Sequence, residues 1–264
     1  MTDAPFARGD VPLPYTVSVI GPLAISGAVL AAGGYVYAGM APQSQLFGST
    51  LIAGNDPDEF ALTYDDGPND ACTEQLLEVL AQHRVRATFF MIGRFARERA
   101  SLVRQIRAAG HLVGNHTWSH PLLLTRSPRR VREELVATSA ELEDILGERI
   151  RYFRPPHGGR RPDVLRAARE MGMVPVLWNA MGYDWRPINA SQIMENLERG
   201  IARNRRRGVG SNLLLHDGGQ AGIGQDRSQT VVATKEMLGS WSERIRFVTV
   251  ERWGDELYSR ASQD

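Results

Sequence analysis

The feature that most constrains the fold of this chain is a regular alternation of two kinds of segment from Glu59 onward. Short runs of β-branched, aromatic or leucine residues alternate with longer segments in which apolar residues recur every three or four positions. The short runs are typical of buried parallel strands, and the longer segments are typical of helices that pack on them. Repeated strand and helix units of this kind predict a parallel sheet or barrel.

Seven segments are predicted as strands, and the fold class is therefore predicted to be α/β. We expect a distorted (β/α)7-type barrel with an additional apolar segment at the N-terminus. The predicted strands are Phe60–Tyr64, Ala87–Ile92, Leu112–Gly114, Tyr152–Phe153, Val174–Trp178, Asn212–Leu215 and Phe247–Val250. The predicted helices are Thr73–Gln82, Phe95–Ala109, Pro128–Leu146, Pro162–Met171, Ser191–Arg206 and Thr230–Ser240.

The 264 residues suffice for one barrel, and we expect a single catalytic domain over residues 51–264. A formal net charge of +1 gives no reason to expect nucleic acid as a partner. Cys72 is the only cysteine, which excludes an intrachain disulfide and a thiolate-rich metal site. Any metal must therefore be held by histidine and carboxylate side chains.

Residues 1–50 form a segment of different character, because no charged residue occurs between Asp10 and Asp56. Residues 17–41 are almost wholly apolar or small, and their length is roughly what a helix needs to cross a bilayer. This predicts a signal-anchor, an uncleaved export signal, or alternatively a helix that covers the barrel. The glycines and proline within the segment weaken any helix prediction. Membrane association through residues 17–41 thus stays an open alternative.

Polar clusters follow five of the predicted strands. Because the carboxyl ends of parallel strands meet on one face, these clusters are expected to converge there. The clusters are Asp65-Asp66, His116 to His120, Arg154 to Gly158, Asp184-Trp185 and His216-Asp217.

Two of these clusters carry metal-ligand chemistry. His116 and His120 are four residues apart, a spacing that places both imidazoles on one face of a helical turn. With one carboxylate they would make a set of two histidines and one aspartate for zinc or a similar metal. Asp65 and Asp66 end an apolar strand, and since consecutive strand side chains point to opposite faces, only a bend lets both enter one site. Taken alone, either cluster could be a structural turn.

The clusters together resemble the polysaccharide deacetylases, or NodB-homology family. The resemblance rests on the order Thr-Tyr-Asp-Asp-Gly-Pro, His-Thr-Trp-Ser-His, Arg-Pro-Pro-His-Gly, Asp-Trp and Leu-Leu-His-Asp, and it runs from about Glu59 to Val250. It implies that Asp66, His116 and His120 bind the metal, Zn2+ or alternatively Co2+ or another divalent ion.

The same resemblance implies the catalytic roles. Asp65 matches the general base, and Arg154 matches the arginine that pairs with it and favours its ionised form. His216 matches the general acid, which the departing amine requires. The main-chain N–H of His157 matches the oxyanion donor, although the family usually carries an aromatic residue there.

The fourth motif departs from the family pattern, because Met181 stands where the family often has an aspartate. Asp184 remains and is expected to orient either Arg154 or His216. Trp185 and Leu213 are candidates for the walls of the acetyl methyl pocket, or alternatively plain core residues.

The predicted function is a metal-dependent hydrolase that removes N-acetyl groups from the N-acetylhexosamine units of a polysaccharide, peptidoglycan or chitin-like, and releases acetate. Two alternatives remain: an amidohydrolase of the same barrel type acting on a small cyclic amide or ureide, and a non-catalytic glycan-binding relative. Export would place the protein in the periplasm or cell envelope, and a cytoplasmic protein would act on a precursor sugar. The sequence leaves the oligomeric state open.

Overall fold

The computed structural model describes residues 32–241 and 245–261. The chain divides into two units, Met1–Val36 and Tyr37–Asp264, and the predicted site residues all belong to the second. Residues 32–40 are helical, but most of the apolar stretch 17–41 lies outside the described residues. Among the residues that are described, no helix combines the length and the hydropathy needed to span a membrane.

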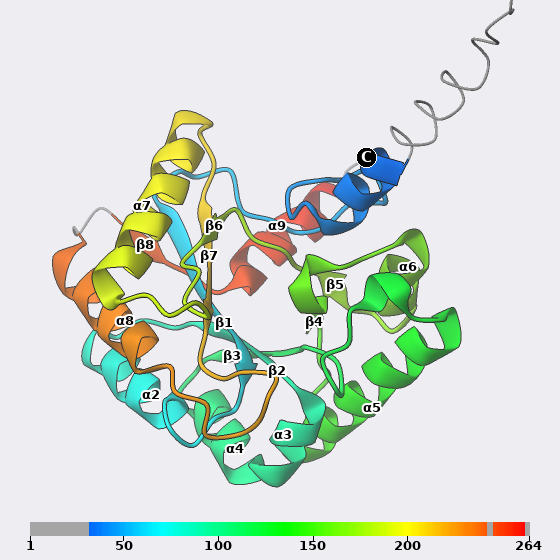
Figure 1. Ribbon diagram of the computed structural model, residues 1–264, viewed down its shortest axis with the longest axis horizontal. Helices are drawn as coiled ribbons and strands as arrows, with labels where there is room; N and C mark the ends of the chain where they lie inside the picture. The colour runs from blue at the N-terminus through cyan, green and yellow to red at the C-terminus, as the bar shows by residue number, and fades with distance from the viewer. Residues whose placement is uncertain (1–31, 242–244, 262–264) are drawn as a thin grey trace, which may run out of the picture. The chain divides into compact units, whose positions relative to one another are not determined.

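The second unit is built on a parallel sheet with the strand order β5-β4-β3-β2-β1-β7-β6, and β8 pairs with the start of β1 (Figure 1). Each strand pair runs parallel. The strands are β1 (Glu59–Gly67), β2 (Thr88–Met91), β3 (Leu112–Asn115), β4 (Tyr152–Phe153), β5 (Val174–Pro175), β6 (Ala180–Met181), β7 (Ser211–His216) and β8 (Arg246–Phe247).

The sheet is curled into an incomplete barrel, as its connections require. Its two outer strands, β5 and β6, are joined directly through residues 176–179. A backbone advances at most about 3.6 Å per residue, so the five steps from Pro175 to Ala180 cover no more than about 18 Å. A flat sheet with six gaps of about 4.8 Å would be about 29 Å wide. The edges can be joined this way only if the sheet curves, which agrees with the predicted distorted (β/α)7-type barrel.

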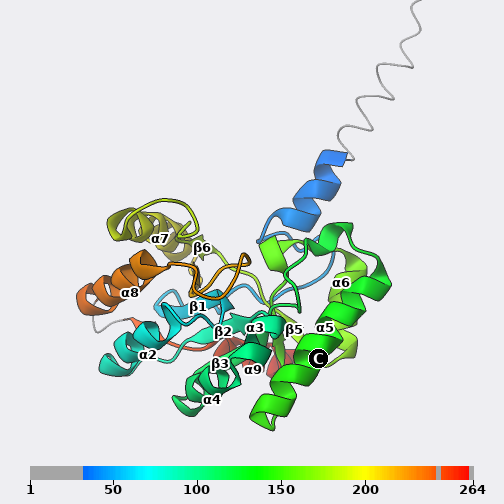
Figure 2. The same ribbon diagram turned by 60° about the horizontal axis from the view of Figure 1, so that its bottom comes forward.

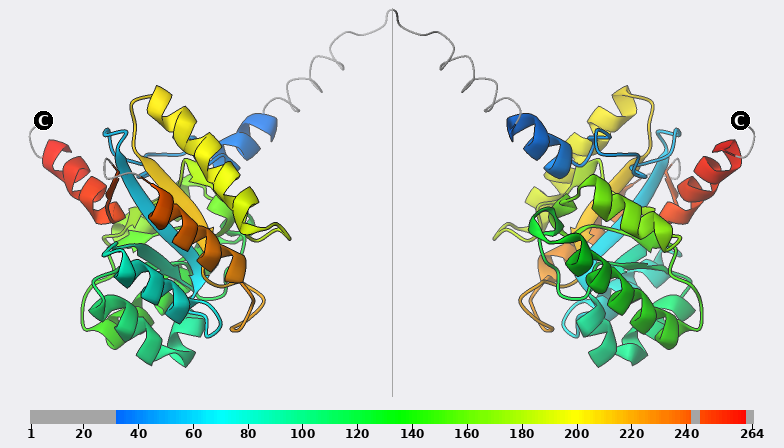
Figure 3. Two further views of the ribbon diagram at one scale, coloured as in Figure 1. Left: turned by 90° about the vertical axis from the view of Figure 1, so that its left-hand side faces the viewer. Right: turned by 90° about the vertical axis from the view of Figure 1, so that its right-hand side faces the viewer.

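Helices flank the curled sheet (Figures 1 and 2). They are α2 (Thr73–Gln82), α3 (Gly93–Glu98), α4 (Ala100–Ala108), α5 (Pro128–Leu146), α6 (Pro162–Glu170), α7 (Ala190–Arg206), α8 (Ser228–Ser240) and α9 (Val250–Ala261), with short 3-10 helices at Leu123–Thr125 and Pro156–Gly158. Figure 3 shows α7 and α8 side by side along β7.

Local sequence signals explain several helix ends. The α5 helix begins where the Ser127 hydroxyl accepts a hydrogen bond from the Arg130 N–H, and it ends at Gly147 with φ 69°. The α7 helix begins with a capping box formed by Asn189 and Gln192. These caps satisfy backbone groups that a helix terminus leaves without partners.

Three sequence predictions were wrong in detail, and one strand was missed. The predicted strand Val174–Trp178 is confined to β5, which ends at Pro175. The predicted helix Phe95–Ala109 is two helices, because the backbone leaves the helical region at Arg99. The predicted strand Phe247–Val250 is confined to β8, since Val250 begins the helix α9. The short strand β6 was not predicted at all.

Alternation along the central strands decides what faces the barrel interior. Leu62 and Tyr64 of β1 and Leu213 and Leu215 of β7 pack in the core cluster beneath the helices. Their neighbours, which include Thr63, Asp65, Asn212, Leu214 and His216, therefore point to the opposite side, into the barrel. The interior face consequently carries polar groups at the ends of β1 and β7.

Candidate functional site

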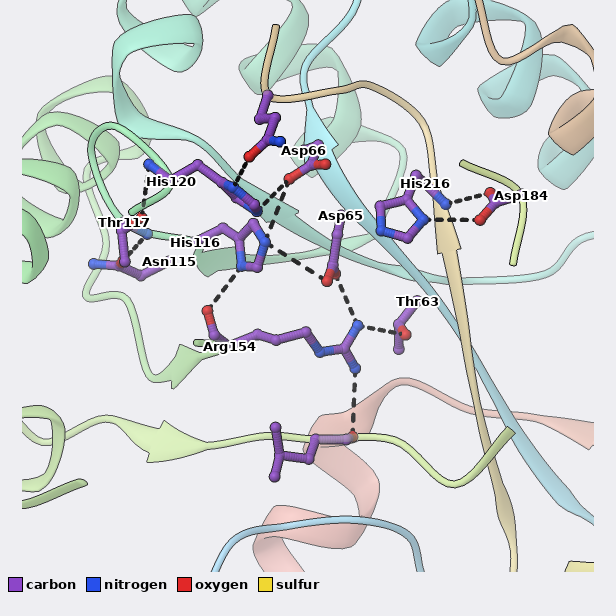
Figure 4. Close-up of polar contacts among 12 residues, drawn as sticks. Thr63, Asp65, Asp66, Asn115, His116, Thr117, His120, Arg154, Asp184 and His216 are labelled. Carbon is purple, nitrogen blue, oxygen red and sulfur yellow. Dashed lines mark hydrogen bonds and ion pairs between the residues drawn. The ribbon is translucent and has the colours of Figure 1, made fainter. Parts of the chain in front are cut away.

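The predicted polar clusters converge at the carboxyl ends of the strands (Figure 4). Asp65 lies near the end of β1, and His216 is the last residue of β7. Most of these side chains line one cavity of about 530 Å3, whose walls include Asp65, Asp66, His116, His120, His157, Met181, Trp185, Leu214, His216 and Gln220. The strands thus assemble a concave polar site, as parallel α/β folds commonly do.

A bend in β1 brings both aspartates into this cavity. The pairing with β2 shifts register between Asp65 and Gly67, and Asp66 adopts φ 72°, in the left-handed region. The bulge cancels the strand alternation that would send one carboxylate away from the site. A β-carbon at residue 67 would overlap the Asp217 carboxylate, so glycine is required at the bend. The sequence-based expectation of a bend is confirmed.

The His116 and His120 pair lies in a loop after β3, and the predicted helical turn was wrong. The loop contains left-handed residues at Thr117, with φ 66°, and at His120, with φ 58°. Side-chain oxygens hold it: the Thr117 N–H donates to Asn115 Oδ1 at 2.8 Å, and the His120 N–H donates to Thr117 Oγ1 at 3.1 Å. These bonds replace the backbone bonds of a helix while still bringing both imidazoles together.

Asp66, His116 and His120 form a set that could hold a metal ion. One ligand atom of each lies within 4.8 Å of the other two. Asp66 Oδ1 is 3.0 Å from His120 Nε2 and 3.4 Å from His116 Nε2, and all three residues are buried.

The hydrogen bonds of the two imidazoles fix which nitrogen faces the carboxylate. His116 Nδ1 lies 2.8 Å from the Arg154 carbonyl oxygen, which can only accept, so Nδ1 donates. His120 Nδ1 donates in the same way to Gln220 Oε1 at 2.8 Å. In the neutral imidazoles both Nε2 lone pairs therefore point at Asp66 Oδ1, which has no hydrogen-bond partner among the described residues.

Such an arrangement of lone pairs calls for a positive charge between them. Burial alone would raise the pKa of Asp66, but when the imidazoles carry that positive charge as protons on Nε2, they hold the pKa well below its ordinary value. A divalent cation suits the oxygen and two nitrogen donors without any thiolate. The residues fit a metal of this class.

Asp65 stands beside this set and is held by Arg154. Arg154 Nη1 donates to Asp65 Oδ1 at 2.8 Å, and Asp65 Oδ2 is 3.7 Å from His116 Nε2. The guanidinium is fully buried and lies 4.2 Å above the Phe90 ring. Burial lowers the pKa of Arg154, and the Asp65 carboxylate opposes that effect. The ion pair compensates the charge of each partner inside the barrel.

Two residues that sequence reasoning missed position Arg154. Thr63 Oγ1 accepts from Nη1 at 2.7 Å, and Asn212 Oδ1 accepts from Nη2 at 3.2 Å. The Asn212 amide donates in turn to the Leu177 carbonyl oxygen at 2.7 Å. Thr63 and Asn212 are polar residues within otherwise apolar predicted strands, and this pattern could have identified them as residues of the site. Gln220, in the loop after β7, had no comparable signal.

Asp184 contacts His216 and not Arg154, among the contacts of the described residues (Figure 4). Its Oδ1 is 2.8 Å from His216 Nδ1, while its Oδ2 accepts from the His216 backbone N–H and from Thr230 Oγ1, both at 2.7 Å. Burial would lower the pKa of His216, but the Asp184 carboxylate outweighs it and raises that pKa to about 9. The imidazole therefore stays protonated at neutral pH.

The cavity walls differ from the prediction at one position. Leu214 lines the cavity, whereas Leu213 is fully buried in the core beneath the helices. The strand alternation places them on opposite faces, so the assignment of Leu213 to the pocket is corrected to Leu214.

Trp185, a predicted wall residue, and His157, predicted as the oxyanion donor, do lie at the cavity. Trp185 is 42% exposed and packs edge-on against His216, with ring centroids 5.2 Å apart. His157 has φ 57° and packs against His120, with ring centroids 4.6 Å apart. Burial lowers the pKa of His157 to about 4, so its ring is neutral at physiological pH.

Comparison with known proteins gives a consistent picture. A polysaccharide deacetylase family model matches residues 53–176. The chain is 40% identical over 158 residues to a chitooligosaccharide deacetylase of Azorhizobium caulinodans, an alignment that covers 60% of this chain and 72% of that protein.

Solved structures agree with this match. A crystal structure of a peptidoglycan N-acetylglucosamine deacetylase superposes with a TM-score of 0.66 at 30% identity, covering 75% of this chain and 89% of that one. A family 4 acetyl xylan esterase from Clostridium thermocellum, in complex with a cobalt ion, gives a TM-score of 0.64 at 28% identity, covering 74% and 89%.

Proposed function

The chain belongs to the polysaccharide deacetylase family, and from this membership we infer that it hydrolyses the acetamide of N-acetylglucosamine units in a glycan and releases acetate. The observation that carries the proposal is the convergence of Asp66, His116 and His120 beside a second, arginine-held aspartate. This arrangement pairs a cation site with a separate proton acceptor, which metal-assisted hydrolysis of an amide requires.

In this proposal Asp66, His116 and His120 hold a divalent cation, and zinc suits the two imidazoles and one carboxylate. The cobalt ion in the acetyl xylan esterase shows that a related protein accepts another divalent metal. When bound, the cation supplies Lewis acidity toward water and toward the acetamide carbonyl. Gln220 and the Arg154 carbonyl group orient the two imidazoles through their Nδ1 atoms.

Asp65 takes the proton of the attacking water. Its Oδ1 is engaged by Arg154, so Oδ2 is the oxygen that faces the cation site, 3.7 Å from His116 Nε2. Thr63 and Asn212 hold the guanidinium in place, so that Asp65 keeps one orientation. The two adjacent aspartates thereby have different tasks.

His216 protonates the amine as it leaves. With a pKa of about 9, the imidazole carries its proton at neutral pH. Asp184 accepts from Nδ1, which leaves Nε2 to serve as the donor toward the substrate. An amine leaves poorly without a proton, so a charged histidine on the same cavity meets a requirement of amide hydrolysis.

Trp185, Leu214 and His157 contribute binding surface in this scheme. Trp185 and Leu214 wall the acetyl group, and the main-chain N–H of His157 faces the developing oxyanion. Because the proposed substrate is a polymer, we propose that the protein acts in the cell envelope, and cell fractionation with an antibody to the chain tests this directly.

The decisive experiment measures acetate released from tetra-N-acetylchitotetraose by the purified, zinc-loaded protein. The Asp65→Asn variant should lose turnover while still binding one equivalent of zinc, because Asp66 and both histidines remain. A chelator should abolish activity and added zinc should restore it. Turnover by Asp65→Asn close to the wild-type rate would contradict the role given to Asp65.

A further inference from the structure

The catalytic cavity adjoins a second one along α7. This second cavity, of about 430 Å3, shares Pro42, Trp178 and Met181 with the first. A third hollow shares Tyr183, Asn196 and Arg199 with the second. Shared walls place these hollows next to one another, with the uncharged Met181 side chain between the first two. Neighbouring hollows of this kind suit a polymer that extends beyond the deacetylated sugar.

The charged residues that line the second cavity are all positive. Arg199 and Arg203 lie four residues apart on α7, and both line it, while its walls contain no acidic residue among those described. Neither arginine has a carboxylate within 4.0 Å in residues 32–241 and 245–261. Glu195 and Glu198 line the neighbouring hollows with Arg199, so the positive potential is confined to the second cavity, where two guanidinium groups face no carboxylate of the described residues.

Both arginines keep donors free for a ligand. Arg199 Nη2 contacts Asn196 Oδ1, and Arg203 Nη2 donates to the Asn179 carbonyl oxygen at 2.9 Å. Each guanidinium has five N–H donors, so several remain. The contacts with Asn196 and Asn179 also restrain the two side chains, which reduces the entropy lost on binding.

We propose that this cavity binds a carboxylate carried by the sugar next to the one that is deacetylated. The inference rests on the proposed function and narrows its substrate. Guanidinium groups match carboxylates in charge and in hydrogen-bond geometry. A homopolymer of N-acetylglucosamine is neutral and offers no such group. A glycan in which N-acetylglucosamine alternates with N-acetylmuramic acid does offer it, wherever the lactyl carboxyl group is free and not joined to a peptide.

The test compares two tetrasaccharides of alternating N-acetylglucosamine and N-acetylmuramic acid, one intact and one with its carboxyl groups reduced to alcohols. We expect wild-type kcat/KM to be about tenfold higher on the intact form, mostly through KM, because the contact is remote from the reacting bond. Arg199→Gln and Arg203→Gln should each remove most of this preference. Their kcat/KM on the reduced form should stay within about twofold of wild type.

Arg206→Gln is the matched control, since Arg206 is exposed on α7 and lines none of the cavities formed by the described residues. Equal wild-type kcat/KM on both substrates, or an equal loss in Arg206→Gln, would overturn the proposal. So would a loss in Arg199→Gln of the same size on both substrates.

Calorimetric binding of both tetrasaccharides to the Asp65→Asn variant separates this inference from the proposed function. Acetate release without a binding preference would refute the carboxylate site and leave the deacetylase function standing. A binding preference that Arg199→Gln abolishes, in a protein that releases no acetate, would support the site and refute the function.

Discussion

Replacing Asp184 with asparagine should move the basic limit of catalysis from alkaline to near-neutral pH. Asp184 is buried and accepts three hydrogen bonds, two of them from His216. Asparagine keeps the size of the side chain but removes the negative charge. The burial that opposes protonation of His216 remains, and Asp65 and Asp66, which also raise its pKa, are compensated by Arg154 and by the bound cation, so the pKa of the imidazole should fall to about its ordinary 6.5.

The size of the effect follows from the two pKa values. A fall from about 9 to 6.5 corresponds to about 3 kcal/mol of preference for the protonated imidazole. At pH 8 a histidine with a pKa of about 9 is roughly 90% protonated, and one with a pKa of 6.5 is about 3% protonated. We therefore expect kcat of the variant to be about 30-fold lower than wild type at pH 8, with the deficit shrinking toward pH 6.

The stability of the fold should change in the same direction. Because the folded-state pKa of His216 lies above the unfolded value, its contribution is fully present below pH 6.5 and is lost as pH rises through about 9. The wild type should thus exceed Asp184→Asn in free energy of unfolding by up to about 3 kcal/mol below pH 6.5 from this charge effect, with a pH-independent loss from the missing hydrogen bonds added to it. Above pH 9 most of this difference should vanish.

The assay is a kcat profile from pH 5 to 10 by acetate release, with urea unfolding at pH 6 and pH 9.5. Thr230→Val is the matched control, because it removes one hydrogen bond to Asp184 and keeps the charge. It should leave the basic limit near the wild-type value. If Asp184→Asn kept that limit near pH 9, or lost the same factor at every pH, the reasoning about His216 would be wrong.

Two further substitutions test the residues that support the site. Gln220→Ala should weaken zinc binding by about 10- to 100-fold in a chelator competition, because it removes the hydrogen-bond partner of His120 Nδ1. Gln225→Ala, which changes another residue of the same cavity, should leave zinc affinity unchanged. An equal loss of zinc affinity in both variants would contradict the role of Gln220. Asn212→Ala should lower the free energy of unfolding by about 1–3 kcal/mol and reduce kcat more than it raises KM, because Arg154 Nη2 and the Leu177 carbonyl group lose a partner. Asn204→Ala is the control, because it removes a buried amide that donates to Ser211 Oγ. It should lower the free energy of unfolding in urea by a similar amount without lowering kcat. If Asn204→Ala lowered kcat as much as Asn212→Ala does, Asn212 would have no specific role.

Helix prediction was exact for two helices, one with capping residues at its ends and one without a side-chain cap. The bounds of α2 and α5 were predicted to the residue, and for α5 Ser127, Pro128 and Gly147 are visible as start and stop signals. The strand β6 has only two residues, too few for any periodicity to develop. It is defined by its pairing with β7, a tertiary contact that no local pattern reveals.

The site residues that directly follow predicted strands were found from the sequence. The residues that hold them in place through side-chain hydrogen bonds were missed, because they lie far away in the sequence. Gln220 and His120 are 100 residues apart in sequence, and Asn212 and Arg154 are 58 apart. Nothing local connects such pairs. For Leu213 the sequence left two alternatives, a pocket wall or a core residue, and alternation decides between them, because a cavity-facing His216 implies that Leu214 shares its face and Leu213 does not.

The ends of β1 and β7 support one another structurally. His216 faces the cavity, and the next residue, Asp217, is buried on the other side of the β1 bend, where Thr73 Oγ1 donates to it at 2.5 Å. Its carboxylate fills the space that a side chain at Gly67 would need, and its N–H donates to the Asp65 carbonyl oxygen at 3.2 Å. The end of β7 therefore presents His216, the proposed acid, and also braces the bend that separates Asp66, the proposed metal ligand, from Asp65, the proposed base. A substitution at Asp217 should for this reason weaken metal binding through Asp66 and also disturb the orientation of Asp65. Asp217 itself is neither a proposed metal ligand nor a proposed catalytic residue.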